Sequence, residues 1–168
     1  MVSNQRNIEL FYKAEIPVKR IPEHSYTLLD TSEGSIFLHV NHYGEDAEYG
    51  NIYISDATGR RFNLSLLHNI RNPKGNCDFD KVYGLEGIYM ANIVSNWQDT
   101  ANAEGYRPTN KKVAANKNAK EKILKKTVIT FDKGGEWEPL TPPERDSEGR
   151  RIYCETDDCS LHLHSLSY

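Results

Sequence analysis

One eight-residue motif constrains the fold of this chain more than any other feature. Residues 130–137 read Thr-Phe-Asp-Lys-Gly-Gly-Glu-Trp, the [Ser/Thr]-x-Asp-x-Gly-x-x-Trp pattern of an Asp-box. The Asp132 carboxylate can accept hydrogen bonds from backbone N–H groups across a tight turn, and Gly134 can take the positive φ that the turn needs. Thr130 and Trp137 then lie on the flanking strands, where the indole packs over the turn. The motif predicts a hairpin held by structural residues, and it does not make Asp132 a catalytic acid or base.

A degenerate copy of the motif lies upstream, at residues 55–62. Ser55, Gly59 and Phe62 keep the offsets of the motif, while Ala57 occupies the position of the turn aspartate. The two copies start 75 residues apart, whereas one propeller blade takes roughly 40–50 residues. Because Asp-box repeats occur mainly in β-propellers and related all-β folds, the pair favours a propeller with one enlarged blade.

The apolar pattern along the rest of the chain is of the strand type. Short alternating or buried runs are separated by Gly, Asn and Asp. We expect strands at 36–42, 51–55, 61–66, 87–94, 127–131 and 160–164. The sequence therefore predicts an all-β fold built from short strands.

Charge is concentrated in two stretches of opposite sign. Residues 111–126 hold seven Lys and one Glu, and residues 136–158 hold eight acidic residues against three Arg. We interpret 95–126 as a Lys-rich insertion loop between two paired strands, with a docking site for an acidic partner as the alternative. The formal net charge of -3 argues against a dedicated nucleic-acid binder, which is normally basic.

The cysteines and histidines do not stand at the spacing of a metal site. Cys154 and Cys159 are near enough in sequence to close a small disulfide loop or to remain two thiols, and no matching pair stands at zinc-ligand spacing. His162 and His164 share one face of the expected strand without a third ligand. Cys77 is then a buried thiol or the partner of a cysteine outside this chain.

We expect no targeting signal within the residues of this chain. It has neither an apolar run near the ~20 residues of a membrane span nor an apolar signal core behind its first residues. A segment from inside a longer secreted or membrane protein would look the same. Asn63-Leu64-Ser65 is an N-glycosylation sequon, which has meaning only in a secretory compartment and only if Asn63 faces outward.

Several blocks of the sequence together resemble a known family. Residues 127–140 around the Asp-box are followed by Pro142-Pro143, by Cys154, and by Cys159-Ser160-Leu161-His162-Leu163-His164. The upstream segments 37–42, 51–55, 62–66 and 85–89 come in the family's order. Over most of its length outside 95–126, the chain resembles the propeller of the sortilin-type sorting receptors, and its form looks closer to the SorLA branch than to the other branches.

The resemblance implies a fold and a function. Residues 1–168 would be a partial domain of about three blades from a ten-bladed propeller. The chain would be the lumenal, ligand-binding part of a transmembrane receptor, not an enzyme and without a cofactor, that carries cargo between Golgi, cell surface and endosomes. The implied partners are peptides and proteins (propeptides, neuropeptides and secreted proteins), with the membrane reached only through segments missing from this chain. The resemblance also implies a disulfide between Cys154 and Cys159.

In the family, the peptide site lies on inner strands that face the propeller channel. The resemblance places Tyr53, Ser55 and Tyr89 at contributing positions, with the alternative that they only fill the strands. Leu64 stands where another member has a basic side chain for a peptide carboxylate. Because Leu64 cannot form a charge-assisted bond, a preference for a C-terminal carboxylate is not expected unless Arg60 or Arg61 supplies the charge.

Two other interpretations compete with a receptor. Sialidases also use Asp-box propellers, but they need an arginine cluster and a Tyr–Glu nucleophile pair. Here the arginines at 60–61 and 150–151 come as adjacent pairs near turns, which is typical of surfaces. The third interpretation is a non-functional gene-model fragment with an unspliced insertion at 95–126.

Overall fold

The computed structural model describes residues 2–4, 7–18, 21, 23–43, 47–97, 123–153 and 159–163. Within these residues, all regular elements are strands, which agrees with the expected all-β class. The strands are β1 (Val2–Asn4), β2 (Asn7–Tyr12), β3 (Tyr26–Asp30), β4 (Phe37–Val40), β5 (Tyr49–Ser55), β6 (Phe62–Ile70), β7 (Phe79–Lys81), β8 (Tyr89–Val94), β9 (Lys125–Thr130) and β10 (Glu138–Pro139). This part of the chain holds no helix long and apolar enough to cross a membrane.

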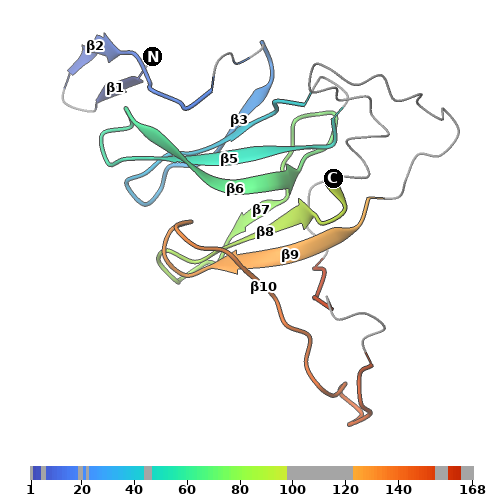
Figure 1. Cartoon of the computed structure of the whole chain (residues 1–168). Coiled ribbons are helices and arrows are strands. Elements are labelled where there is room, and N and C mark those ends of the chain that lie inside the picture. Colours follow the sequence, from blue (N-terminus) through green and yellow to red (C-terminus); the bar gives the residue numbers. More distant parts are fainter. Residues whose placement is uncertain are drawn as a thin grey trace, which may run out of the picture.

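The strands β3 to β10 form two antiparallel meanders of four strands each. In the first meander β3, β4, β5 and β6 pair in succession, and in the second β7, β8, β9 and β10 do so. A single residue pair, Asn69 with Ile93, joins β6 to β8. Figure 1 shows the first meander above the second, with β1 and β2 as a separate pair. Four-stranded meanders are the repeating unit of a β-propeller, so the architecture agrees with the expected propeller fragment.

The two meanders share a hydrophobic core on the faces that they turn toward each other. Its buried members are Phe37, Ile52 and Leu66 from the first meander and Tyr89, Ala91 and Val128 from the second. The rings of Phe37 and Tyr89 are 4.7 Å apart. Burying one such side chain contributes about 1.5–3 kcal/mol, whereas one hydrogen bond contributes about 0.5–1.5 kcal/mol. Side-chain packing therefore holds the meanders together more than the single backbone bridge does.

The first meander buries its opposite face against the chain that precedes it. Adjacent residues of a strand point to opposite faces, so Leu38 and Tyr53 lie away from Phe37 and Ile52. They join a second core cluster with Val40 and Phe62. Side chains from the segment between β2 and β3 cover this cluster; they are Ala14, Ile16, Val18 and Ile21.

A recurring Asp/Asn-x-x-Gly turn closes three connections of the chain. Asp56, Asn72 and Asp146 each accept a hydrogen bond from the backbone N–H four residues later, at 3.1, 3.0 and 2.9 Å. The glycine of each turn has a positive φ, of 70, 88 and 79° respectively. Side chains of Asp and Asn mimic a backbone turn, and glycine takes the left-handed conformation without a steric cost.

Five of the six expected strand segments coincide with β4, β5, β6, β8 and β9. The expected strand at 160–164 is different, because residues 160–163 form no strand. Leu161 instead accepts a hydrogen bond from Thr127 N at 3.1 Å and donates one to Leu140 O at 2.9 Å. This short contact continues the outer edge of the second meander beyond β10.

The two charged stretches extend into β9 and β10, and the assignment of 95–126 as an insertion loop stays a prediction. The expected insertion 95–126 joins β8 to β9, which are paired neighbours. Its residues 98–122 lie outside the described residues, and Lys125 and Lys126 belong to β9. In the acidic stretch, an Arg145–Arg151 bridge closes a small hairpin. Figure 1 shows the chain after β10 running away from the sheet into this hairpin.

Candidate functional site

The second Asp-box turn, at residues 130–137, is organised by Asp132. Its Oδ1 accepts hydrogen bonds from the backbone N–H groups of Gly135 at 2.9 Å and Glu136 at 3.0 Å. Thr130 Oγ1 donates to the same carboxylate at 2.8 Å and accepts from Gly134 N at 2.9 Å. The bond from Glu136 N, followed by that from Thr130, lowers the pKa of Asp132. All of these bonds stay within the turn, so the carboxylate has a structural role.

The same turn also contacts the first meander, through Ser65 of β6. Trp137 Nε1 donates to Ser65 Oγ at 3.0 Å, and Ser65 Oγ donates to the carbonyl of Gly134 at 2.5 Å. A Cβ on Gly134 would lie 2.6 Å from Ser65 Oγ and 2.9 Å from the ring of Phe37. Glycine is therefore required at 134 for close approach as well as for its φ of 84°. The sequence pattern of the Asp-box does not reveal Ser65.

The first Asp-box copy also forms a turn with a glycine of positive φ, although Ala57 replaces the motif aspartate and the hydrogen bonds differ from those of the second turn. Asp56, one residue earlier, accepts hydrogen bonds from Thr58 Oγ1 at 2.7 Å and from Arg60 N at 3.1 Å. The bond from Thr58 is the main reason that the pKa of Asp56 is lowered. The recurring Asp/Asn-x-x-Gly spacing is the sequence signal that identifies Asp56.

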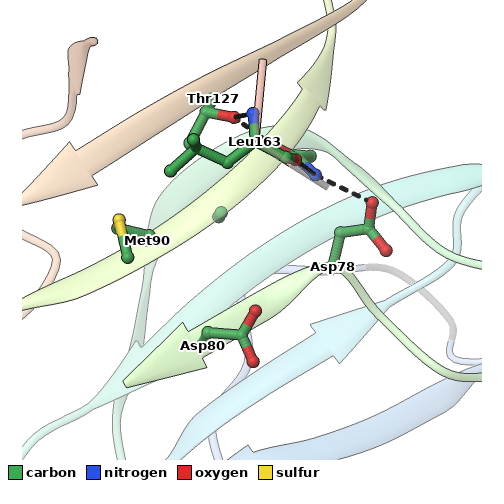
Figure 2. Close-up of a pocket in the computed structure, with 7 residues that line it drawn as sticks. Asp78, Asp80, Met90, Thr127 and Leu163 are labelled. Carbon is green, nitrogen blue, oxygen red and sulfur yellow. Dashed lines mark hydrogen bonds between the residues drawn. The ribbon is translucent and has the colours of Figure 1, made fainter. Parts of the chain in front are cut away.

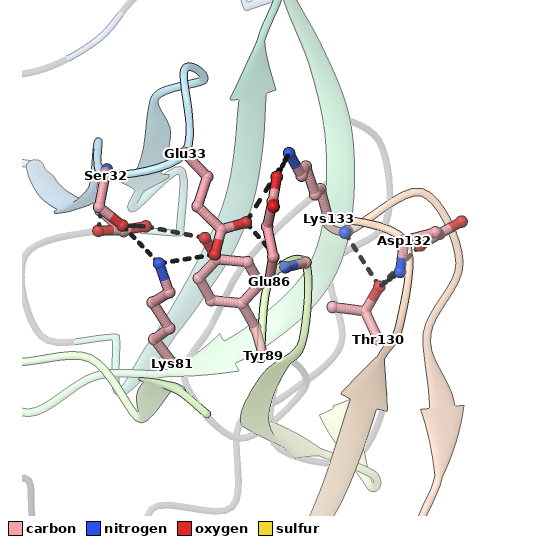
Figure 3. A network of polar contacts seen from close by, with 11 residues as sticks. Ser32, Glu33, Lys81, Glu86, Tyr89, Thr130, Asp132 and Lys133 are labelled. Atoms are coloured by element: carbon pink, nitrogen blue, oxygen red, sulfur yellow. Dashed lines mark hydrogen bonds and ion pairs between the residues drawn. The ribbon is translucent and has the colours of Figure 1, made fainter. Parts of the chain in front are cut away.

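A polar network lies at the end of the sheet where the turns of both meanders meet (Figure 3). Glu33, from the β3–β4 turn, has an 8% exposed side chain and forms an ion pair with Lys81 of β7 at 2.6 Å. Its other oxygen accepts the Gly87 N–H at 2.8 Å and lies 4.0 Å from Lys133 Nζ. Lys133 also pairs with Glu86 at 2.8 Å. The hydrogen bond from Lys81 is the main cause that lowers the pKa of Glu33.

Tyr89 connects this network to β3. Its side chain is fully buried, and its hydroxyl donates to Asp30 Oδ2 at 2.8 Å. Burial, followed by the bond to Asp30, raises the pKa of Tyr89. Burial also acts to raise the pKa of Asp30, but hydrogen bonds from Tyr89 and Ser32 outweigh it, so that the pKa is lowered. Lys81 Nζ donates to Ser32 Oγ at 2.7 Å, which places a cation beside the end of β3.

Tyr53 and Ser55, which the resemblance groups with Tyr89, lie on β5 in the interior of the first meander. Each is 5% exposed. The Tyr53 hydroxyl is 2.9 Å from His42 Nε2. Ser55 Oγ accepts the Ile36 N–H at 2.8 Å and donates to Asp56 O at 2.8 Å. Tyr53 and Tyr89 belong to different core clusters, so the structure does not bring the three hydroxyls into one cavity.

A small pocket of about 100 Å³ lies on the outer face of the second meander (Figure 2). Asp78 and Asp80 of β7 line it together with Met90 and Leu163. A hydrogen-bonded chain crosses its floor: Asn92 Nδ2 donates to Asp78 Oδ2 at 3.1 Å, Thr127 Oγ1 to Asn92 Oδ1 at 2.6 Å, and Leu163 N to Thr127 Oγ1 at 2.7 Å. The described residues contain no group of three His, Cys, Asp or Glu side chains that could hold a metal ion.

Some of the other residues singled out from the sequence, which are the sequon, the cysteines and the histidines, lie within the described residues. Asn63 is exposed on β6, and the Cys77 thiol is free, with burial raising its pKa to about 12. Cys159 is exposed, but Cys154 lies outside the described residues, so their pairing stays a prediction. His162 is exposed, and His164 also lies outside the described residues.

The alternative basic groups lie beside the first Asp-box turn. Arg60 lies over the Tyr12 ring at 4.7 Å, and Arg61 is 3.6 Å from Glu15. Leu64 is 48% exposed on the neighbouring strand β6. Each arginine thus already has a partner within the chain.

The comparisons with known proteins cover nearly the whole chain. The family model described as Sortilin-Vps10 (Sortilin, neurotensin receptor 3) matches residues 1–168. Vacuolar protein sorting/targeting protein 10 of Ajellomyces capsulatus strain H143 is 40% identical over 166 residues, which are 95% of this chain. Vacuolar protein sorting/targeting protein PEP1 of Saccharomyces cerevisiae strain RM11-1a is 41% identical over 150 residues, or 86% of this chain.

The chain spans only 10% of the length of the Ajellomyces relative and 8% of the Saccharomyces one. Both relatives are named as vacuolar protein sorting/targeting proteins, and a closer relation of this chain to the SorLA branch stays a prediction. The match of the family model over all residues, the identity of about 40% and the paired four-stranded meanders agree with one another. The chain therefore belongs to the sortilin-Vps10 family.

Proposed function

We propose that this chain is part of the lumenal, cargo-binding propeller of a membrane sorting receptor. The names of its relatives support a role in vacuolar protein sorting and targeting. The cargo would be peptides and soluble proteins, including propeptides, that the receptor carries between Golgi, cell surface and endosomes. Anchoring in the membrane would come from parts of the longer protein outside these 168 residues.

The observation that carries this proposal is the free edge of β3. This strand ends the pairing order of the sheet, and within the described residues no strand pairs with its outer side. Unpaired N–H and C=O groups along such an edge can pair with an extended peptide. Tyr26 and Leu28, two residues apart, are each 59% exposed on this strand, so they supply apolar contacts for alternate side chains of the peptide.

The polar network borders one end of this edge and supports the same assignment. Asp30 is the last residue of β3, and Tyr89 and Ser32 hold its carboxylate in place. The neighbouring Lys81 side chain is 28% exposed and already pairs with Glu33, so a peptide lying along β3 would meet a charged and hydrogen-bonded border there. We assign Tyr89 to the border of the site.

Tyr53 and Ser55 are assigned a supporting role behind the site. Ser55 holds the Ile36 N–H at the start of β4, which is the strand that pairs with β3. Tyr53 packs in the core cluster on the other face of the meander. Both residues therefore position the strand on which β3 rests.

The experiment is a sorting assay on the full-length protein, in cells that lack the native copy. Leu28→Lys replaces an apolar contact on the free edge. Burying the rest of such a side chain contributes about 1–2 kcal/mol, so cargo affinity should fall about 5- to 30-fold. We expect the secreted fraction of soluble vacuolar proteins to rise while the amount of receptor stays unchanged.

The matched control is Tyr153→Lys, because Tyr153 is 81% exposed on the hairpin beyond β10. This variant should sort cargo normally. Equal sorting by the Leu28 variant and the unmodified receptor would refute the assignment of the β3 edge. Unchanged sorting in cells that lack the receptor altogether would refute the receptor function itself.

A further inference from the structure

The sequon at Asn63 lies at the contact between the two meanders. Asn63 is exposed on β6, whereas Leu66, three residues later, is buried in the shared core. A glycan on Asn63 would therefore extend into solvent from the folded chain, as attached sugars do. The hydroxyl residue of the sequon is Ser65.

Ser65 is already engaged in the folded state by residues of the second Asp-box turn. Its Oγ donates to Gly134 O and accepts the indole N–H of Trp137. These partners lie 69 and 72 residues downstream of Ser65. The backbone of Asn63 is also fixed, because it pairs with Ile54 of β5.

A folded chain therefore presents a poor acceptor for sugar transfer. The sequon requires Ser or Thr at its third position, and here that hydroxyl makes two internal hydrogen bonds within a paired strand. Before residues 130–137 are synthesised and docked, the same hydroxyl has neither partner. The two uses of Ser65 cannot be simultaneous.

We propose that Asn63 carries an N-glycan that is added only before the second Asp-box turn docks on β6, and that Ser65 first serves the acceptor site and then holds the two meanders together. The proposal rests on the lumenal location assigned above. In the transfer, the Asn63 amide nitrogen forms a bond to the anomeric carbon of a lipid-linked oligosaccharide. The bond from that carbon to the lipid pyrophosphate breaks, the pyrophosphate leaves, and the amide loses one proton.

The test is a pulse-chase measurement of glycan occupancy at Asn63 in the full-length protein, read by mass spectrometry of the peptide with and without glycosidase. In the unmodified protein, occupancy should be partial at the end of the pulse and should not rise during the chase. Trp137→Phe removes the indole N–H and loosens the docked turn, so occupancy should continue to rise in the chase. Tyr153→Phe, at an 81% exposed side chain on the hairpin beyond β10, should behave like the unmodified protein.

Two further variants separate the glycan from the contact. Asn63→Gln removes the glycan and keeps the Ser65 hydrogen bonds, whereas Ser65→Ala removes both. We expect only Ser65→Ala to make the β6 and Asp-box region more sensitive to protease. Equal sensitivity in the two variants would overturn the second role of Ser65, and a rise of occupancy during the chase of the unmodified protein would overturn the order of events.

A control sequon distinguishes failure of this inference from failure of the lumenal location. Arg145→Asn, made in the Asn63→Gln background, places an acceptor before Asp146 and Ser147 on the exposed hairpin. A glycan at 145 in this variant, with none at 63 in the unmodified protein, would overturn the inference and keep the receptor assignment. No glycan at either position would overturn both.

Discussion

Replacing Gly134 by alanine tests whether the second Asp-box turn packs on the first meander. The φ of 84° at this position lies in the left-handed region, which costs an L residue about 1–2 kcal/mol. The new Cβ would also lie 2.6 Å from Ser65 Oγ and 2.9 Å from the ring of Phe37. Forcing extra volume into a packed contact costs about 1–3 kcal/mol, so the full effect should be about 2–5 kcal/mol.

Gly149→Ala is the matched control, because Gly149 has a φ of 79° and its Cβ would meet nothing within 4 Å. This control should show only the backbone cost. The assay is hydrogen exchange with mass spectrometry on the full-length protein, which reports local opening free energies. Gly134→Ala should lower protection in β6 and β9 by about 1–3 kcal/mol more than Gly149→Ala lowers it near residue 149. Equal losses would refute the packing of the turn on β6.

Two further predictions concern the polar network and acid stability. Glu33→Gln should weaken the ion pair with Lys81, which is 2.6 Å long, and increase hydrogen exchange in the β3–β4 and β7–β8 turns. The control is Glu86→Gln, at a 77% exposed side chain, which should change exchange little. A larger effect of Glu86→Gln than of Glu33→Gln would contradict this role of Glu33. Burial, reinforced by the charge of Arg71, lowers the pKa of His39 from 6.5 to about 4. The neutral ring therefore stabilises the fold fully above pH 6.5, and this stabilisation is lost as the pH falls from 6.5 toward 4, by about 2 kcal/mol at pH 5. His39→Gln should remove this loss of stability at acid pH, measured as hydrogen exchange in β4 and β5. The control His24→Gln, at an exposed turn, should leave the loss unchanged. An unchanged loss in His39→Gln would show that His39 is not its source.

The parts of the fold that could be predicted from the sequence are the local ones. The Asp132 turn depends on contacts within four residues, so a short motif contains all of its chemistry. Strands β5, β6 and β8 are long and rich in buried apolar residues, and their pattern reveals them. Strands β3 and β7 are short and carry charged residues, so their apolar pattern is too weak to predict them as strands.

The contacts that assemble the candidate site are not local, and the sequence could not reveal them. Ser65 meets Trp137 across 72 residues, and Glu33 meets Gly87 across 54. No spacing rule connects residues so far apart, because their proximity depends on how the meanders pack. The three residues Tyr53, Ser55 and Tyr89 show the same limit, since the family resemblance groups them while the structure places them in separate environments.

Site-specific photocrosslinking shows whether the β3 edge of this chain contacts cargo. A photoreactive amino acid would replace Leu28 in the full-length receptor in cells, and Tyr153 in a parallel control. We expect position 28 to crosslink to precursors of soluble vacuolar proteins, identified by mass spectrometry, and position 153 not to do so. The assignment of the β3 edge would be wrong if position 28 gave no such crosslinks, or if position 153 gave equally strong ones.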